Sequence, residues 1–275
     1  MRHSILPGSA RLRCVVLGAG VAALLVACEV PTRVVPANET RDRVTASDEP
    51  DAQKRARARL ELASAYFGRG QMTTALDQVK LSIAADPLYG DAFNLRGLIY
   101  ANLGDTALAE ESFKRALQLN ARDADTMHNY GWYLCQQKRY GESNAMFGQA
   151  LAITQYRGAA RTMLAQGVCQ AHAGQLADAE ASLVRAHELD PSSPFTATNL
   201  AEVLYRRGEY ERARFYIRRV NALADVANAQ TLWLAARIEM KLGNRQGASD
   251  FGTQLRNRFP ESREASSYGR SAFDE

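Results

Sequence analysis

The chain has 275 residues, of which 46% are hydrophobic and 23% are charged, and its formal net charge at pH 7 is +4. The first 27 residues carry three arginines and no acid, which leaves +1 for the remainder. A nucleic-acid-binding domain usually shows a basic stripe. The arginines between residues 206 and 219 are instead interleaved with Glu209 and Glu211, which indicates local ion pairs on a solvated face. No nucleic-acid partner is expected.

The N-terminus has the layout of an export signal, in which basic residues precede an apolar run from Cys14 to Val26. The run is too short to span a bilayer comfortably. It ends in Leu25-Val26-Ala27-Cys28, which resembles the lipoprotein box of bacterial lipoproteins. The resemblance implies that residues 1–27 are a signal peptide and that Cys28 is acylated. An ordinary signal peptide or an uncleaved anchor is the alternative.

Acylation of Cys28 would hold the protein on a membrane without a transmembrane helix, because each buried methylene contributes about 0.8 kcal/mol and two or more acyl chains anchor stably. The next residue is Glu29 and not the Asp that commonly retains lipoproteins in the inner membrane. The resemblance therefore implies the outer membrane, with the protein facing the periplasm. Residues 28–55 contain Pro31, Pro36 and Pro50 and few large apolar residues, which predicts a flexible tether.

Residues 56–262 repeat one pattern six times at intervals of 34 to 36 residues. A small residue is followed by an aromatic or apolar residue, a turn with Gly, an Ala and a second large apolar residue. In the second segment these are Gly97, Tyr100, Gly104, Ala109 and Phe113. Such a period is typical of stacked helical hairpins, and the pattern resembles the tetratricopeptide repeat. The resemblance implies an all-α, right-handed superhelical solenoid of about six repeats and about twelve helices.

The residue types explain why the hairpins close. Small residues at the eighth and twentieth positions let the two helices approach, and large apolar residues fill the space beside them. Proline ends the second helix of three repeats, at Asp86-Pro87, Asp190-Pro191 and Phe259-Pro260.

Departures from the pattern concern single repeats. Lys138 replaces the usual Gly in the third repeat, and Gly252 stands in the sixth where a large apolar residue is expected. The sixth repeat is therefore expected to fray or to act as a cap. Residues 263–275 are polar and lack helical periodicity, which predicts a frayed tail.

Two cysteines remain after the signal and the acylated Cys28 are set aside. They are Cys135 and Cys169, on the first helices of the third and fourth hairpins. An exported protein works where thiols are oxidised, and neighbouring helices can bring two Cα atoms within about 7 Å. We predict a disulfide that joins repeats three and four. Two buried free thiols are the alternative.

The sequence shows no catalytic or metal-binding constellation. His128, His172 and His187 are the only histidines after the signal, and no two of them stand three or four residues apart, as the paired histidines of a helical metal site do. There is also no phosphate-binding loop, nucleophile elbow or HExxH motif. We therefore expect a protein that is not an enzyme and that needs no cofactor or metal.

In tetratricopeptide arrays the first helices of the hairpins line the concave side. Positions that point inward predict an apolar trough with amide and charged rims, suited to an extended or helical peptide. The candidates are Leu60, Phe67, Asn94, Leu98, Asn102, His128, Trp132, Leu164 and Val168. Trp132 and Phe67 are the strongest, because an aromatic side chain supplies much buried area. The alternative is that several of the apolar candidates pack between adjacent repeats.

One familiar use of such a groove is not expected. Repeats that clamp the C-terminal carboxylate of chaperones carry a Lys and an Asn at the fifth and ninth positions, and this chain has Leu60 and Ser64 there.

The segment from His128 to Cys135, HNYGWYLC, resembles the third repeat of the type IV pilus biogenesis lipoproteins called PilF or PilW. Gly167-Val168-Cys169, the DPSSP string at residues 190–194, the lipoprotein box and the six repeats extend the resemblance. It implies a monomeric outer-membrane pilotin that binds the pilus secretin PilQ and promotes its outer-membrane localisation and multimerisation. A lipoprotein adaptor for cell-wall synthesis or outer-membrane protein assembly is the alternative, and an accessory protein of a periplasmic enzyme is a third hypothesis.

Overall fold

The computed structural model describes residues 50–273, and this part of the chain is organised in thirteen α-helices without a β-strand. The signal sequence, Cys28 and the tether up to residue 49 lie outside the described residues. The helices are α1 (Asp51–Gly68), α2 (Met72–Ala85), α3 (Gly90–Leu103), α4 (Thr106–Leu119), α5 (Ala124–Gln136), α6 (Tyr140–Leu151), α7 (Ala159–His172), α8 (Leu176–Leu189), α9 (Pro194–Arg206), α10 (Tyr210–Asn221), α11 (Ala229–Lys241), α12 (Arg245–Arg258) and α13 (Arg263–Gly269).

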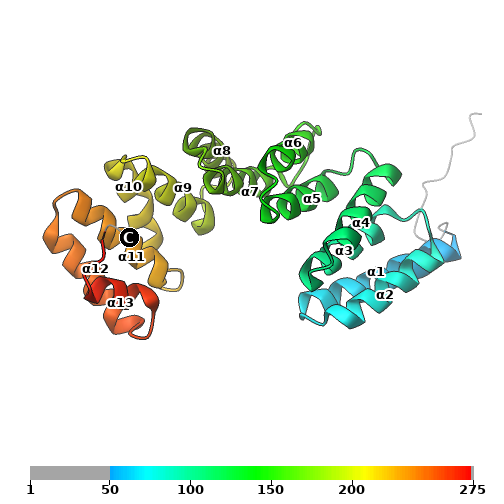
Figure 1. Ribbon diagram of the computed structural model, residues 1–275, viewed down its shortest axis with the longest axis horizontal. Coiled ribbons are helices and arrows are strands. Elements are labelled where there is room, and N and C mark those ends of the chain that lie inside the picture. Colours follow the sequence, from blue (N-terminus) through cyan, green and yellow to red (C-terminus); the bar gives the residue numbers. More distant parts are fainter. Residues whose placement is uncertain (1–49, 274–275) are drawn as a thin grey trace, which may run out of the picture. The chain divides into compact units, whose positions relative to one another are not determined.

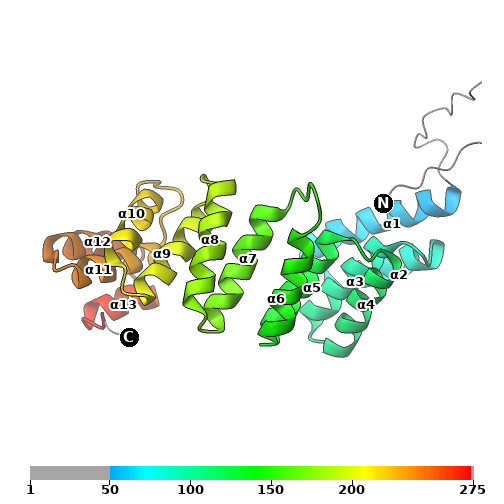
Figure 2. The ribbon, with the colours of Figure 1, turned by 90° about the horizontal axis from the view of Figure 1, so that it is seen from above.

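Helices α1 to α12 form six hairpins, and each hairpin lies beside the next in chain order (Figures 1 and 2). We call the odd-numbered members of the pairs A helices and the even-numbered members B helices. The predicted all-α tetratricopeptide solenoid is confirmed. Helix α1 begins at Asp51, so residues 51–55, which the sequence assigns to the tether, are already helical.

Each hairpin closes where a small residue of the A helix faces a large residue of the B helix. A Cβ atom added to Gly97 would lie 2.8 Å from the ring of Phe113, and one added to Gly131 would lie 2.9 Å from the ring of Phe147. Both phenylalanine side chains are fully buried. Because the two sides are matched in size, the helices approach closely and the rings fill the remaining space.

The turns within the hairpins explain the repeated glycine. Gly104 follows α3 with a φ of 84°, a left-handed conformation in which a Cβ atom is strained. The third hairpin has Lys138 at the corresponding place, also with a positive φ of 60°. A residue with a Cβ atom costs about 1 to 2 kcal/mol in this region, so the third turn is less favourable than its neighbours.

The sixth hairpin and the segment that follows it are more ordered than the sequence predicts. Gly252 on α12 is buried, and a Cβ atom there would overlap the ring of Tyr268 on α13. The predicted frayed tail is therefore wrong for residues 263–273: Ser262 caps α13 by accepting a hydrogen bond from the Ala265 N–H, 3.1 Å away. Tyr268 of the tail thus fills the space that a large side chain at position 252 of the sixth repeat would occupy.

Three aromatic side chains hold this last helix in place. The ring of Phe273 lies 5.2 Å from that of Trp233 on α11, and the ring of Tyr268 lies 5.8 Å from that of Phe273. Helix α13 has only seven residues, too few to display a helical period. Aromatic packing and the cap, not periodicity, order this segment.

Neighbouring repeats are joined by side chains at the turn ends of the B helices. Between repeats two and three, Glu110 on α4 pairs with Arg139 before α6, with N and O atoms 2.6 Å apart. Between repeats four and five, Glu180 on α8 pairs with Arg212 on α10 at 2.7 Å. Between repeats three and four the same place holds two amides, and Asn144 Nδ2 lies 3.5 Å from Gln175 Oε1.

Candidate peptide-binding site

Three A helices, α5, α7 and α9, together line an open cavity of about 410 Å³. Four of the nine predicted groove residues meet there, namely His128, Trp132, Leu164 and Val168. The cavity is completed by Arg161, Ala165, Phe195 and Asn199. An apolar floor with a few polar groups at its edge is the usual form of a site that binds an apolar side chain.

Phe195 is the most exposed large side chain of this cavity, with 74% of its surface accessible. It stands in the first turn of α9, directly after Pro194, which occupies the first position of the helix. Such an exposed aromatic ring gains from burial against a partner. Phe195 therefore presents an exposed apolar surface at the edge of the cavity.

His128 lies at the back of the cavity and is buried. Its Nδ1 atom is 2.9 Å from the hydroxyl oxygen of Thr162 on α7. Burial, and next the positive charge of Arg161, lower the pKa of His128 to about 4, although Asp125 opposes the shift. The imidazole is thus neutral near pH 7 and offers the cavity a hydrogen-bonding ring instead of a charge.

The rim at α5 and α7 is held by Asp125. Arg161 Nη2 lies 2.7 Å from its Oδ1 atom, and the Tyr156 hydroxyl donates a hydrogen bond to the same atom at 3.1 Å. The side chains of Arg161 and Asp125 are both more than half exposed, so the pair contributes little to stability. Its effect is to keep the guanidinium at the mouth of the cavity.

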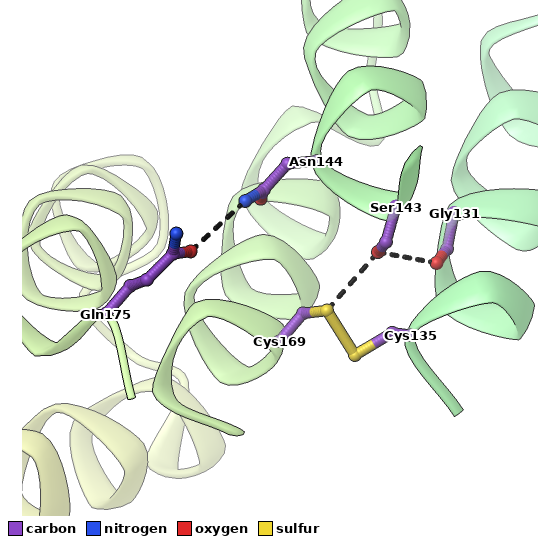
Figure 3. The surroundings of a disulfide bond; sticks show 6 residues. All are labelled: Gly131, Cys135, Ser143, Asn144, Cys169 and Gln175. Atoms are coloured by element: carbon purple, nitrogen blue, oxygen red, sulfur yellow. Dashed lines mark hydrogen bonds between the residues drawn. A yellow bond between two sulfur atoms is a disulfide. The ribbon is translucent and has the colours of Figure 1, made fainter. Parts of the chain in front are cut away.

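Trp132 packs against a disulfide between Cys135 and Cys169. The two Cα atoms of this disulfide are 5.8 Å apart, and Figure 3 shows its surroundings. The Ser143 hydroxyl donates to the carbonyl of Gly131 at 2.7 Å and lies 3.3 Å from the sulfur of Cys169. The structure thus joins the pair of cysteines that the sequence singles out. The bond links α5 to α7, the two helices that supply most of the cavity.

The other five predicted groove residues do not reach this cavity. Leu60, Phe67 and Leu98 are half-buried and pack against the apolar core of the first two repeats. Asn94 accepts a hydrogen bond from Asn129 at 3.1 Å, which joins α3 to α5, whereas Asn102 donates to the carbonyl of Leu98 within α3 at 2.9 Å. Contact of these five side chains with a peptide stays a prediction.

Sequence reasoning missed two kinds of contributor. Ala165 lacks a chemical signal of its own, and Asn199 becomes visible only when α9 is placed against α7. Among residues 50–273, no three metal-ligating side chains gather into a group, and no helix is both long and apolar enough to cross a bilayer.

Comparison with known proteins agrees with this architecture. Tetratricopeptide-repeat models match residues 90–123, 124–155 and 170–232. The solved structure described as PilW, a widely conserved type IV pilus biogenesis factor, is 31% identical; the match covers 78% of this chain and 97% of that one, with a TM-score of 0.72. The chain belongs to the PilF/PilW family of type IV pilus biogenesis proteins.

Two further comparisons concern PilF of Pseudomonas aeruginosa. The type IV pilus assembly protein PilF is 28% identical over 207 residues, which is 75% of this chain and 82% of the relative. A solved PilF structure has a TM-score of 0.71 at 26% identity and covers 81% of this chain and all of that one. The PilF/PilW family and the repeat fold point to a scaffold or adaptor that works through protein contacts in pilus biogenesis.

Proposed function

We propose that this protein is a pilotin, which binds the pilus secretin PilQ and escorts it to the outer membrane, where the secretin forms its multimeric ring. The observation that carries the proposal is the cavity of α5, α7 and α9, built on the HNYGWYLC segment and bordered by the exposed ring of Phe195. A cavity that can cover an apolar segment suits a protein that shields an unassembled subunit.

The membrane address in this proposal comes from Cys28. Its acylation would hold the solenoid at the outer membrane, facing the periplasm, and residues 29–50 would link the anchor to α1. Fractionation of cells and labelling with palmitate test this part. A Cys28→Ser variant should lose the label and leave the membrane fraction, whereas a wild-type protein that never takes up palmitate contradicts it.

The binding role is tested in a strain that lacks the gene. Deletion should abolish heat-resistant secretin multimers and twitching, and the wild-type gene should restore both. A Trp132→Ala/Phe195→Ala variant should restore little, because it removes the apolar contacts of the cavity. Phe215→Ala is the matched control, since Phe215 is also an exposed phenylalanine but lies on α10, away from the cavity.

The outcome separates this proposal from an adaptor for another envelope assembly. If the deletion strain keeps normal secretin multimers and twitching, the pilotin proposal is wrong. Defects confined to cell-wall synthesis or to other outer-membrane proteins would then assign the protein to those pathways.

A further inference from the structure

A second cavity adjoins the first on the side toward α13. It has a volume of about 310 Å³ and is lined by α9, α11 and α13. Asn199 lines both cavities, so they adjoin at this residue, and we call the two together the groove. The chemistry changes along it: the first cavity is floored by Trp132, Leu164 and Val168, and the second presents Glu202, Gln230 and Glu264 beside Trp233.

Glu202 and Glu264 are the two carboxylates of the second cavity. Among residues 50–273, neither Glu202 nor Glu264 forms an ion pair or a side-chain hydrogen bond. Three other acids in this part of the array, Glu209, Glu211 and Glu239, are paired with arginines. Within the described part of the chain, two acids thus stay unpaired in the same cavity, although arginines are frequent in this part of the sequence.

Among the described residues that line this cavity, Arg237 is the one with a basic side chain. Its guanidinium lies over the ring of Tyr205, 4.5 Å from the centroid. The charges that line the cavity therefore sum to a negative value, which favours a basic group in the ligand.

Asn199 is suited to guide a peptide between the two cavities. Its amide nitrogen donates to the Phe195 carbonyl at 2.8 Å, so its amide oxygen can accept a backbone N–H of the ligand.

We propose that the groove binds a secretin segment in which an apolar stretch adjoins a basic side chain. The apolar stretch lies in the cavity of α5, α7 and α9, and the lysine or arginine lies between Glu202 and Glu264. This inference rests on the proposed function and adds the chemistry of the recognised segment. It also gives α13 a role in recognition, because Glu264 comes from that helix.

Synthetic peptides provide the test. Fifteen-residue peptides that tile the secretin of the same organism are titrated against the Cys28→Ser protein from residue 28 onward, with fluorescence polarisation as readout. The tightest peptide is then remade with each Lys or Arg replaced by Glu. We expect this charge-reversed peptide to bind at least about tenfold more weakly, which is about 1.4 kcal/mol.

Variants of the protein assign the effect to the two carboxylates. Glu202→Lys/Glu264→Lys should reverse the preference, so that the charge-reversed peptide binds better than the original. Glu261→Lys is the matched control, because this exposed carboxylate lies outside the groove, and it should keep the wild-type preference. Phe195→Ala should weaken both peptides by a similar factor, since it removes an apolar contact. Circular dichroism verifies that each variant is folded.

The outcomes separate the inference from the function on which it rests. If secretin peptides bind but the Glu202→Lys/Glu264→Lys variant keeps the wild-type preference, the inference is wrong and the pilotin proposal stands. If no secretin peptide binds, both are wrong. Dimerisation of the protein alone, seen by light scattering and abolished by the same double variant, would assign the groove to a second copy and overturn the inference.

Discussion

The junction between repeats three and four is built differently from those on either side of it. Repeats two and three, and repeats four and five, are tied by Glu–Arg pairs at the turn ends of the B helices. At the intervening junction that place holds Asn144 and Gln175, 3.5 Å apart (Figure 3). Between the A helices of this junction, a disulfide and the contact of His128 with Thr162 join α5 to α7.

The difference follows from what the junction carries. The cavity of α5, α7 and α9 lies on the A helices, so a tie in that layer fixes the spacing of the residues that line it. A covalent bond keeps this spacing at any ionic strength, whereas a surface ion pair weakens as salt screens it. Binding geometry and stability therefore depend on the same few residues at the junction between repeats three and four.

The largest expected effect comes from removal of the disulfide. Cys135→Ala/Cys169→Ala should lower the free energy of unfolding by about 3 to 4 kcal/mol, because the bond closes a loop with a sequence separation of 34. Urea unfolding measures this loss, and hydrogen exchange should place it at α5 and α7. Reductant should destabilise the wild type and leave the variant unchanged. A loss below 1 kcal/mol would show that packing alone holds the junction.

Acid should act next, through His128. Its folded pKa is about 4 and the ordinary value is about 6.5, so the unfolded chain takes up a proton first as the pH falls. Stability is thus complete above pH 6.5 and decreases toward pH 4, by up to about 3 kcal/mol. Unfolding measured across this window should show the decrease. In a His128→Gln variant the slope in this window should be much smaller, and an unchanged slope would contradict the assignment.

The ion-paired junction between repeats two and three should lose stability at a lower pH than the site of His128. Hydrogen bonds from Arg139 and Lys114 lower the pKa of Glu110 to about 2. Because the folded state favours the carboxylate, the contribution is present above about pH 4.5 and is lost as the pH falls toward 2. In a double-mutant cycle with Glu110→Gln and Arg139→Gln, the pair should contribute about 1 kcal/mol at pH 7. A coupling energy that does not fall between pH 4.5 and 2 would contradict this explanation.

The smallest expected effect comes from building a Glu–Arg ion pair at the junction between repeats three and four. In the variant without the two cysteines, Asn144→Glu/Gln175→Arg should recreate the neighbouring ion pair and restore about 0.5 kcal/mol. Asn144→Glu alone should restore nothing, because it adds a charge without a partner. The gain should shrink at 1 M salt, where charges are screened within a few ångströms.

Much of the fold follows from local features of the sequence. The match of Gly97 with Phe113, repeated by Gly131 with Phe147, is a size pattern that can be read along the chain. The cysteines at similar positions of adjacent A helices lead to the disulfide by the same reasoning. These features are predictable because the same positions recur in each repeat.

The rest depends on contacts that have no period. Helix α13 is fixed by Tyr268 against a glycine of α12, and a seven-residue helix gives no sequence signal of its own. Repeat positions alone could not show that Leu60 and Phe67 pack on the core while Trp132 and Val168 line a cavity. The same is true of His128, whose neutral state follows from its burial and not from its place in the repeat.

The contact of Tyr268 with Gly252 also sets a limit on how this array could be lengthened. A hairpin copied into the interior would meet the same matched surfaces that its neighbours already present. A hairpin placed after α12 would instead have to displace the ring of Tyr268. Gly252 would then offer the new hairpin no side chain to pack against. A duplicated hairpin could therefore be inserted between two repeats but not after α12, unless a large residue first replaces Gly252.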